Sequence, residues 1–253
     1  MLQTAKRLTQ SALFSVGLKI DRITFPTELS AEDRAVFNYV WSNGLTMASP
    51  ERLFATLLAC RHVARSHVEG DFVECGVWRG GNSIVAADVF KRVAASRSVH
   101  LFDTFAGMTS PTAADVSFDG IAAGSIFRRT QANAHSTWCY SSLDEVKDNF
   151  RRYNLLTESV RFVQGDVLES LERPDVIPER ISVLRLDTDW YASTRKELEV
   201  LYPRLSIGGV LIVDDYGHWG GARQAVDEYF AERPRPFLQY IDYTGRSGIK
   251  MAN

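Results

Sequence analysis

The chain alternates short apolar runs with longer segments in which apolar residues recur every three or four positions. Short apolar runs bounded by turn residues are typical of buried parallel strands, and the longer periodic segments are typical of helices. The pattern predicts strands at 72–75, 98–103, 160–164, 181–186, 210–213, 237–242 and 248–252. It predicts helices at 50–68, 82–95, 142–153, 194–205 and 221–232. This alternation favours an α/β fold with a doubly wound sheet.

The predicted sheet has seven strands and is mostly parallel. The last two strands flank Thr244-Gly245-Arg246, which favours a C-terminal β-hairpin. Five parallel strands followed by a hairpin is the strand count of a Rossmann-like methyltransferase sheet, whereas a dinucleotide-binding dehydrogenase more often adds a sixth parallel strand. Two helix starts are also marked. Ser49-Pro50-Glu51 supplies an N-cap, and the segment from Ser142 to Glu145 matches a capping box.

No Pro/Ser/Gly-rich linker divides the chain, so we predict one domain over 46–253, preceded by an N-terminal helical arm over 1–45. The arm has an amphipathic face that could pack against another subunit, which suggests a homo-oligomer. The segment 109–141 is poor in periodicity and rich in Ala, Ser, Gly and Thr. Long irregular segments in compact domains are often functional loops, so we predict a lid inserted at about 109–141.

The composition is that of an ordinary soluble globular protein, with 45% hydrophobic residues, 24% charged residues and a formal net charge of -2. This balance favours neither a nucleic acid nor an anionic membrane surface as a partner. The cysteines Cys60, Cys75 and Cys139 form neither a disulfide framework nor a zinc motif, which favours a reducing cytoplasm. The apolar runs are shorter than a membrane span, and the opening segment lacks the cleavage site of a signal peptide.

Two predicted strands end in carboxylates. Asp187 follows the strand at 181–186, and Asp214 and Asp215 follow the strand at 210–213. Because open α/β sheets place their ligands at the carboxyl ends of the strands, we expect these side chains to meet at one rim. Like charges that close repel one another unless a cation lies between them, which indicates a site for a hard metal ion. The alternative is helix N-capping, which explains one of the two adjacent aspartates but hardly both.

The first strand ends in a glycine-rich turn, Glu74-Cys75-Gly76-Val77-Trp78-Arg79-Gly80-Gly81. Its glycines let a ligand approach the backbone closely, and the helix that follows offers free N–H groups. The spacing differs from the Gly-x-Gly-x-x-Gly of pyrophosphate-binding turns. An acid two residues before the first glycine suits the amino group of S-adenosylmethionine better than a pyrophosphate. A turn with a purely topological role is the alternative.

Two further acids complete a predicted adenosyl pocket. Asp103 ends the second strand at a separation from the glycine turn that suits ribose hydroxyls, although it could also be a turn residue. Asp166 follows the third strand, where it could accept a hydrogen bond from the adenine amino group. The glycine turn and these two acids together predict a nucleoside pocket beside the metal rim.

Four longer motifs lie within 46–230, namely GDFVECGVWRGG at 70–81, LFDTF at 101–105, LDTDWYAST at 186–194 and DDYGHWGGARQAVD at 214–227. In these motifs the sequence resembles the macrocin O-methyltransferase (TylF/MycF) family. That family contains magnesium-dependent O-methyltransferases that take the methyl group from S-adenosylmethionine and act on sugar or phenolic hydroxyls of antibiotic-like natural products. The resemblance implies a Rossmann-like class I methyltransferase fold and a small-molecule acceptor with neighbouring hydroxyls.

The resemblance also implies roles for individual residues. Asp187, Asp214 and Asp215 are the implied magnesium ligands. The candidate cofactor contacts are Met47, Ser49, Glu74, Gly76, Trp78, Gly80, Ser83, Asp103, Asp166 and Asp187.

Methyl transfer to a hydroxyl requires an in-line approach and a base. Magnesium could bind two neighbouring hydroxyls and lower their pKa, so that a carboxylate on the same ion takes the proton. We expect Asp187 to be this base, with Asp189 or His135 in reserve. His218 could reach the acceptor or orient a helix or a ligand carboxylate. The aromatic side chains of Trp190, Tyr191 and Trp219 could form an apolar wall around the metal or pack in the core.

Two other classes of function compete with this interpretation. A nucleotide-dependent oxidoreductase could use a similar sheet, but its glycine spacing would differ. A non-catalytic protein that binds an adenosyl ligand would have no need of the three clustered acids.

Overall fold

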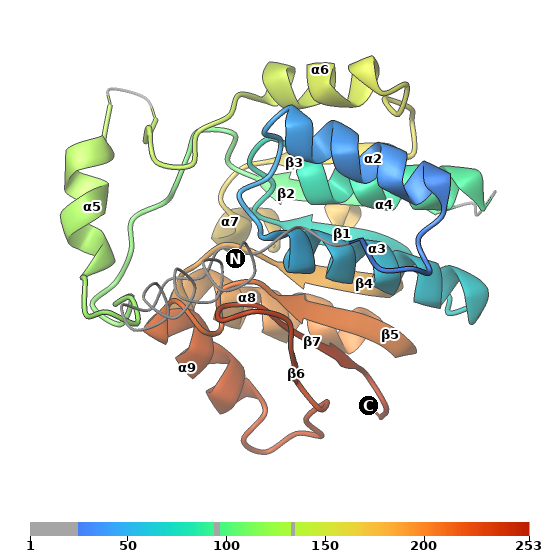
Figure 1. Cartoon of the computed structure of the whole chain (residues 1–253). Helices are drawn as coiled ribbons and strands as arrows, with labels where there is room; N and C mark the ends of the chain where they lie inside the picture. The colour runs from blue at the N-terminus through green and yellow to red at the C-terminus, as the bar shows by residue number, and fades with distance from the viewer. Residues whose placement is uncertain (1–24, 94–96, 133–134, 253) are drawn as a thin grey trace, which may run out of the picture. The chain divides into compact units, whose positions relative to one another are not determined.

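The computed structural model describes residues 25–93, 97–132 and 135–252. The chain forms two compact units, Met1–Arg34 and Ala35–Asn253, and the sheet belongs to the second (Figure 1). The strands run in the order β3-β2-β1-β4-β5-β7-β6. β1 to β5 pair in parallel, whereas β7 is antiparallel to both β5 and β6. The predicted seven-stranded, mostly parallel sheet with a C-terminal hairpin is confirmed. The strand bounds are β1 Asp71–Cys75, β2 Val99–Asp103, β3 Val160–Gln164, β4 Ile181–Leu186, β5 Leu205–Val213, β6 Gln239–Tyr240 and β7 Arg246–Ile249.

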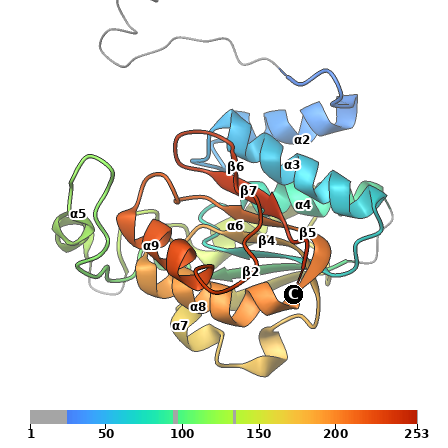
Figure 2. The same ribbon diagram turned by 90° about the horizontal axis from the view of Figure 1, so that it is seen from below.

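Helices cover both faces of this sheet, as Figure 2 shows. α3 and α4 pack against each other on one face, and α8 and α9 pack against each other on the opposite face. The helix bounds are α2 Ala31–Ser42, α3 Pro50–Arg65, α4 Gly81–Arg92, α5 Ala123–Thr130, α6 Leu143–Arg152, α7 Val167–Ser170, α8 Tyr191–Leu201 and α9 Gly220–Tyr229, with 3₁₀ turns at Pro174–Val176 and Tyr202–Arg204.

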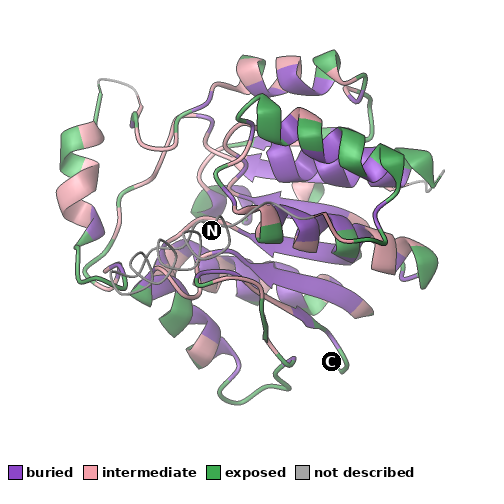
Figure 3. Cartoon of the chain, in the orientation of Figure 1, coloured by how far each residue is buried: buried purple, intermediate pink, exposed green. Residues whose placement is uncertain are grey.

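The interior of the sheet is apolar, and Figure 3 shows the central strands as mostly buried. Every residue of β4 is buried, including Arg185 within an otherwise apolar or small sequence. The largest described core cluster joins β1, β4 and β5 to α8 and α9. The strands that end at the candidate site are therefore packed against the helices on this face of the sheet. In the described part of the chain, no helix is long and apolar enough to cross a membrane.

Two helix starts were predicted from caps. Ser49 Oγ accepts the Arg52 N–H at 3.2 Å, which confirms the N-cap of α3. Ser142 Oγ likewise accepts the Glu145 N–H at 3.2 Å. The capping box is nevertheless half formed, because the Glu145 carboxylate accepts from Arg79 at 2.8 Å and from Ser141 at 3.0 Å.

The C-terminal hairpin is shorter than predicted. Asp242 accepts the backbone N–H groups of Thr244 and Gly245, at 3.0 and 2.6 Å, and so forms a turn where the sequence predicted the end of a strand. β7 consequently begins at Arg246 rather than at Gly248. The strand that pairs with β7 is longer than predicted. β5 begins five residues earlier, at Leu205 rather than at Val210.

The predicted lid is more regular than its sequence indicated. It contains helix α5, and β-bridges join Val116 to Ala122 and Ser117 to Trp219. In Figure 1, α5 projects to the side of the sheet's carboxyl edge. The helix escaped prediction because its eight residues provide only two turns of pattern.

Part of the predicted N-terminal arm is also helical. α2 begins with a reciprocal capping box, in which Ser30 Oγ accepts the Asp33 N–H at 3.2 Å and Asp33 Oδ2 accepts the Ser30 N–H at 3.0 Å. The charged and apolar residues at 1–22 that suggested an amphipathic arm lie outside the described residues. The boundary at 45, the homo-oligomer and the cytoplasmic location stay predictions.

Candidate active site

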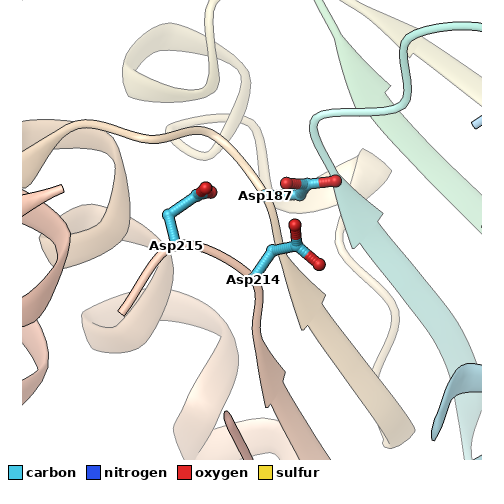
Figure 4. Close-up of side chains that lie close together, drawn as sticks. All are labelled: Asp187, Asp214 and Asp215. Carbon is cyan, nitrogen blue, oxygen red and sulfur yellow. The ribbon is translucent and has the colours of Figure 1, made fainter. Parts of the chain in front are cut away.

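Three carboxylates meet at the carboxyl end of the sheet. Asp187 directly follows β4, and Asp214 and Asp215 directly follow β5. Each offers one oxygen atom, and these atoms all lie within 4.8 Å of one another. Figure 4 shows the three side chains turned toward a shared space from two adjacent strand ends. The predicted convergence is therefore present, since neighbouring parallel strands bring their ends to the same edge.

Two arginines that the sequence analysis did not single out partly neutralise this cluster. Arg185 donates to both Asp187 and Asp214 from within β4. Arg52 on α3 donates to Asp214 and, at 3.0 Å, to Asp242 Oδ2. A buried arginine in an apolar strand is rarely tolerated without acidic partners. That rule was the signal available in the sequence for Arg185.

The carboxyl groups of the site still outnumber these two arginines. Burial raises the pKa of Asp214 to about 7, opposed by Arg185 and reinforced by Asp187. Burial likewise raises the pKa of Asp215 well above its usual value, and the nearby Asp189 adds to the shift. Asp215 Oδ2 is buried and has no hydrogen-bond partner in the described structure. An unpartnered buried carboxylate oxygen beside two others fits a hard divalent cation.

The glycine turn after β1 lies against the same rim. Gly76 has a φ of +84°, and a Cβ there would collide with the carbonyl group of Asp187. Trp78 also has a positive φ, of +46°. Asp103 at the end of β2 holds this turn, because its Oδ2 accepts the N–H groups of Val77 and Trp78 at 2.6 and 3.2 Å. The Asp103 carboxylate thus acts as a turn residue and also faces the cleft.

A cleft of about 370 Å³ joins the glycine turn to the three acids. A smaller cavity of about 60 Å³ shares Gly76, Asp103 and Asp187 with it and extends toward Asp166 and Ser193. The larger cleft is lined both by residues of the glycine turn and by lid and helix-start residues, among them Met108, Ile121, Ile126, Trp138, His218 and Trp219. Such a mixed polar and apolar lining suits a nucleoside together with an organic acceptor.

The structure places most of the predicted cofactor residues on this cleft. Met47, Gly76, Trp78, Asp103 and Asp187 line the larger cavity, and Asp166 lines the smaller one. Asp166 also caps α7 by accepting the Leu168 N–H at 2.9 Å.

Four predicted cofactor residues lie apart from the cavity surface. Glu74 and Ser83 are buried and hydrogen-bonded to each other, and Glu74 also pairs with Arg185 at 3.1 Å. Ser49 caps α3 and donates to Asp242 at 2.7 Å. Gly80 adopts a φ of +89° next to Val146 and Phe150. These four residues are absent from the described lining of both cavities.

The two reserve bases behave differently. Asp189 lines the cleft and has a φ of +68°. His135 is absent from the described lining of the cleft, and its ring packs against Tyr140 at 4.5 Å between centroids. The structure therefore brings Asp189, and not His135, to the metal rim.

Aromatic side chains gather at one end of the lid, beside the cleft. Trp138 of the lid lies 5.5 Å from Trp190 and 6.1 Å from Trp219 between ring centroids. Trp190 is buried in this cluster, whereas Trp219 both packs there and lines the cleft. Tyr191 points elsewhere, because its hydroxyl donates to Glu228 at 2.7 Å. His218 lines the cleft and bonds to Tyr243 at 3.1 Å.

The strand order, the glycine turn and the cleft at the carboxyl ends define a class I methyltransferase dependent on S-adenosylmethionine. The chain belongs to the macrocin O-methyltransferase (TylF) family, whose model matches residues 5–246. It is an O-methyltransferase. The resemblance noted in the sequence is thereby confirmed.

Named relatives support this assignment. Demethyldecarbamoylnovobiocin O-methyltransferase of Streptomyces niveus is 37% identical over 192 residues, which are 76% of this chain and 70% of that protein. Mycinamicin III 3''-O-methyltransferase of Micromonospora griseorubida is 37% identical over 185 residues, or 73% and 69% of the two chains. Among solved structures, the O-methyltransferase NovP matches with a TM-score of 0.70 at 36% identity and covers 82% of each chain.

Proposed function

We propose that this protein is a magnesium-dependent O-methyltransferase that methylates a hydroxyl of a small-molecule natural product, in a sugar moiety of the acceptor. The observation that carries the proposal is the meeting of the Asp187, Asp214 and Asp215 oxygens within 4.8 Å beside the cofactor cleft. The unpartnered Oδ2 atom of Asp215 supports a cation at this position. Carboxylate oxygens are the ligands that magnesium prefers in proteins.

A sugar acceptor is supported by the relatives and by the chemistry of the metal rim. A Streptomyces olivaceus relative, 37% identical over 185 residues, carries a name that specifies a rhamnosyl-bearing tetracenomycin and methylation at its 4'-O position. A sugar offers two neighbouring hydroxyls, which can share one hard cation. The aromatic lining contributed by Trp138 and Trp219 suits the larger apolar body to which such a sugar is attached.

The residues of the site have different roles in the proposed reaction. Magnesium held by the three aspartates supplies Lewis-acid activation of a hydroxyl, and S-adenosylmethionine supplies the methyl group. Gly76 carries no side chain, so the glycine turn can lie directly against the Asp187 carbonyl group at the metal rim. Trp138 and Trp219 exclude water from the acceptor side. The turn and the acids together hold both substrates in one cleft, which is the main requirement of an in-line displacement.

We assign the role of base to Asp189 rather than to Asp187. Asp187 already accepts a hydrogen bond from Arg185 and offers an oxygen to the three-acid cluster, so its carboxylate is committed to the arginine and the metal. Asp189 lies two residues further along the same turn and faces the cleft. Burial raises the pKa of Asp189 to about 7, which suits a base that works near neutral pH. A carboxyl group that faces the cleft can take the hydroxyl proton as the methyl group is transferred.

Calorimetric titration tests the cofactor and the metal separately. The protein should bind S-adenosylhomocysteine and not NADH, and it should bind Mg²⁺. An Asp215→Asn variant should lose Mg²⁺ binding and keep the homocysteine nucleotide. Asp148→Asn on the exposed face of α6 is the matched control and should behave as wild type. If the wild-type protein bound no Mg²⁺ with either nucleotide or acceptor present, the metal-dependent proposal would fail.

The acceptor is found by a direct assay. The enzyme, S-adenosylmethionine and Mg²⁺ are incubated with matched glycosides and aglycones, and products are followed by mass spectrometry for the gain of one methyl group. Methylation of the glycoside alone supports a sugar hydroxyl. Methylation of the aglycone alone would move the proposal to a phenolic or other non-sugar hydroxyl.

A further inference from the structure

The carboxylate of Asp115 joins the lid to the first turns of two helices. Asp115 belongs to the lid sequence but is completely buried. Its Oδ1 accepts the backbone N–H of Tyr191 at 2.8 Å, across 76 residues of sequence. Its Oδ2 accepts from the Thr112 N–H at 2.6 Å and from the Thr112 hydroxyl at 2.8 Å. One oxygen thus holds α8, and the other holds the lid.

Asp115 provides the cap that α8 lacks. The residue at the N-cap position, Trp190, has no side chain able to accept a hydrogen bond, and the first helical N–H is satisfied by Asp115 instead. The first N–H groups of a helix require such a partner and carry a partial positive charge. A buried carboxylate is well placed there.

The same carboxylate lies against the start of α9. A Cβ on Gly221 would collide with Asp115 Oδ1. Gly221 therefore leaves the space that the carboxylate occupies between the two helices. The absence of a side chain at this position of α9 is explained by a lid residue more than a hundred positions earlier in the sequence.

Both helices follow the strand ends that carry the metal-rim acids. The turn from Asp187 to Tyr191 connects β4 to α8. The turn from Asp214 to Gly220 connects β5 to α9, and there the Val116 carbonyl accepts the Gly220 N–H while the His218 carbonyl accepts the Phe118 N–H, each at 2.8 Å. Residues 112–118, the lid root, are thus bonded to both turns.

We propose that Asp115 is a positioning residue that couples the lid to the metal-rim turns. This inference rests on the proposed metal-dependent function. Asp115 fixes the far end of the Asp187–Tyr191 turn, and the neighbouring lid backbone fixes the Asp214–Gly220 turn. Ordering the lid over an acceptor therefore holds the three acids in their binding geometry, and loosening the lid root relaxes them.

The chemistry of asparagine makes Asp115→Asn an informative substitution. A carboxylate has two accepting oxygens, whereas an amide has one. The amide of this variant cannot accept both the Tyr191 N–H and the two Thr112 donors, so it must release either α8 or the lid. Gly221→Ala displaces the carboxylate by a second, independent route. Asp148→Asn serves as a surface control.

Three measurements test the coupling, made on each full-length variant at a temperature well below its unfolding midpoint. Mg²⁺ affinity by calorimetry should fall by about tenfold or more in Asp115→Asn and Gly221→Ala, the usual scale for losing a group that orients metal ligands. S-adenosylhomocysteine affinity should be unchanged, because the glycine turn and Asp103 are not touched. Limited proteolysis should cut within 109–141 faster than in wild type.

The outcomes separate the two proposals. If the wild-type protein binds Mg²⁺ and both variants bind it equally well, Asp115 does not position the metal rim and the inference is overturned. If the variants lose S-adenosylhomocysteine and Mg²⁺ together, Asp115 merely supports the fold, which also overturns the inference. If the wild-type protein itself binds no Mg²⁺, the proposed function fails first.

Discussion

Arg185 on β4 lies directly opposite Glu74 on β1, and the two side chains form an ion pair of 3.1 Å. Neither side chain is meaningfully exposed, with 0% and 1% of their surfaces accessible. Burial raises the pKa of Glu74 to about 8, opposed by the charge of Arg185 and by a hydrogen bond from Ser83. The pair links the strand that carries the glycine turn to the strand that ends in Asp187.

Replacement of Arg185 by methionine should strongly destabilise the protein. The variant leaves Glu74, Asp187 and Asp214 without their shared cation, and removing one member of a buried ion pair costs about 3–5 kcal/mol. Urea denaturation measures the loss. Arg151→Met, which breaks an exposed pair with Asp148, should cost less than about 1 kcal/mol. Equal losses in the two variants would show that the buried pair has no special role.

Substitutions of Asp187 and Asp189 should have different effects on metal binding. Asp187→Asn should lose Mg²⁺ affinity and turnover together and leave affinity for S-adenosylhomocysteine nearly unchanged. Asp189→Asn should keep Mg²⁺ and lower kcat by about 10²–10⁴, the usual contribution of a general base. Turnover that survived in Asp189→Asn would move the role of base back to Asp187 or to another group.

The lid tryptophan should act on the acceptor alone. Trp138→Ala removes the ring that packs against Trp190 and Trp219. We expect the acceptor KM to rise roughly fivefold, because the loss of aromatic contacts is worth about 1 kcal/mol. Affinity for S-adenosylhomocysteine, measured by calorimetry, should stay constant. Trp138→Phe keeps an aromatic ring and should recover most of the loss, whereas a matching fall in nucleotide affinity would contradict a role confined to the acceptor.

The fold was largely predictable because its signals are local. Strand runs such as 160–164 and 181–186 end where the structure ends them, since turn residues mark both sides. The meeting of Asp187 with Asp214 followed from topology alone, because parallel strands with adjacent ends share one rim. Elements with weak periodicity were missed. The two-turn helix α5 and the shortened β6 are decided by tertiary contacts and by the Asp242 turn.

The electrostatic partners within the site were less predictable, because they are distant in sequence. Arg185 pairs with Glu74 across 111 positions, and Asp115 bonds to Tyr191 across 76. The sequence showed acids at strand ends but not which bases would face them. The same limit explains the reserve base at His135, whose position depends on how the lid folds.

Glu197 of α8 provides a test of the site's electrostatics that does not depend on a metal. Its side chain is completely buried, one carboxyl oxygen accepts from the Thr188 hydroxyl at 2.8 Å, and the other has no hydrogen-bond partner in the described structure. Burial raises the pKa of Glu197 to about 8, opposed by the Thr188 hydrogen bond and reinforced by the charge of Asp187. Near neutral pH the folded protein therefore keeps this group mostly protonated.

Glu197 should make the free energy of unfolding fall as the pH rises. In the unfolded chain the Glu197 pKa is about 4.3, so the folded state binds the extra proton. The stability that protonated Glu197 contributes is fully present below the unfolded pKa of about 4.3. It is lost as the pH rises toward the folded pKa of about 8. Glu197→Gln is neutral at every pH and should become progressively more stable than wild type across this range, as measured by urea denaturation at a series of pH values.

Glu197→Ala is the matched variant that separates charge from packing. It removes the Thr188 contact and opens a cavity, so it should be less stable than Glu197→Gln at every pH by about 2 kcal/mol or more. Its difference from the glutamine variant should not change with pH. If the free-energy gap between wild type and Glu197→Gln were also flat between about pH 5 and 8, an interval set by the two pKa values, Glu197 would not titrate on unfolding. The buried carboxyl group would then be ionised in the folded protein, with a cation or water serving its second oxygen.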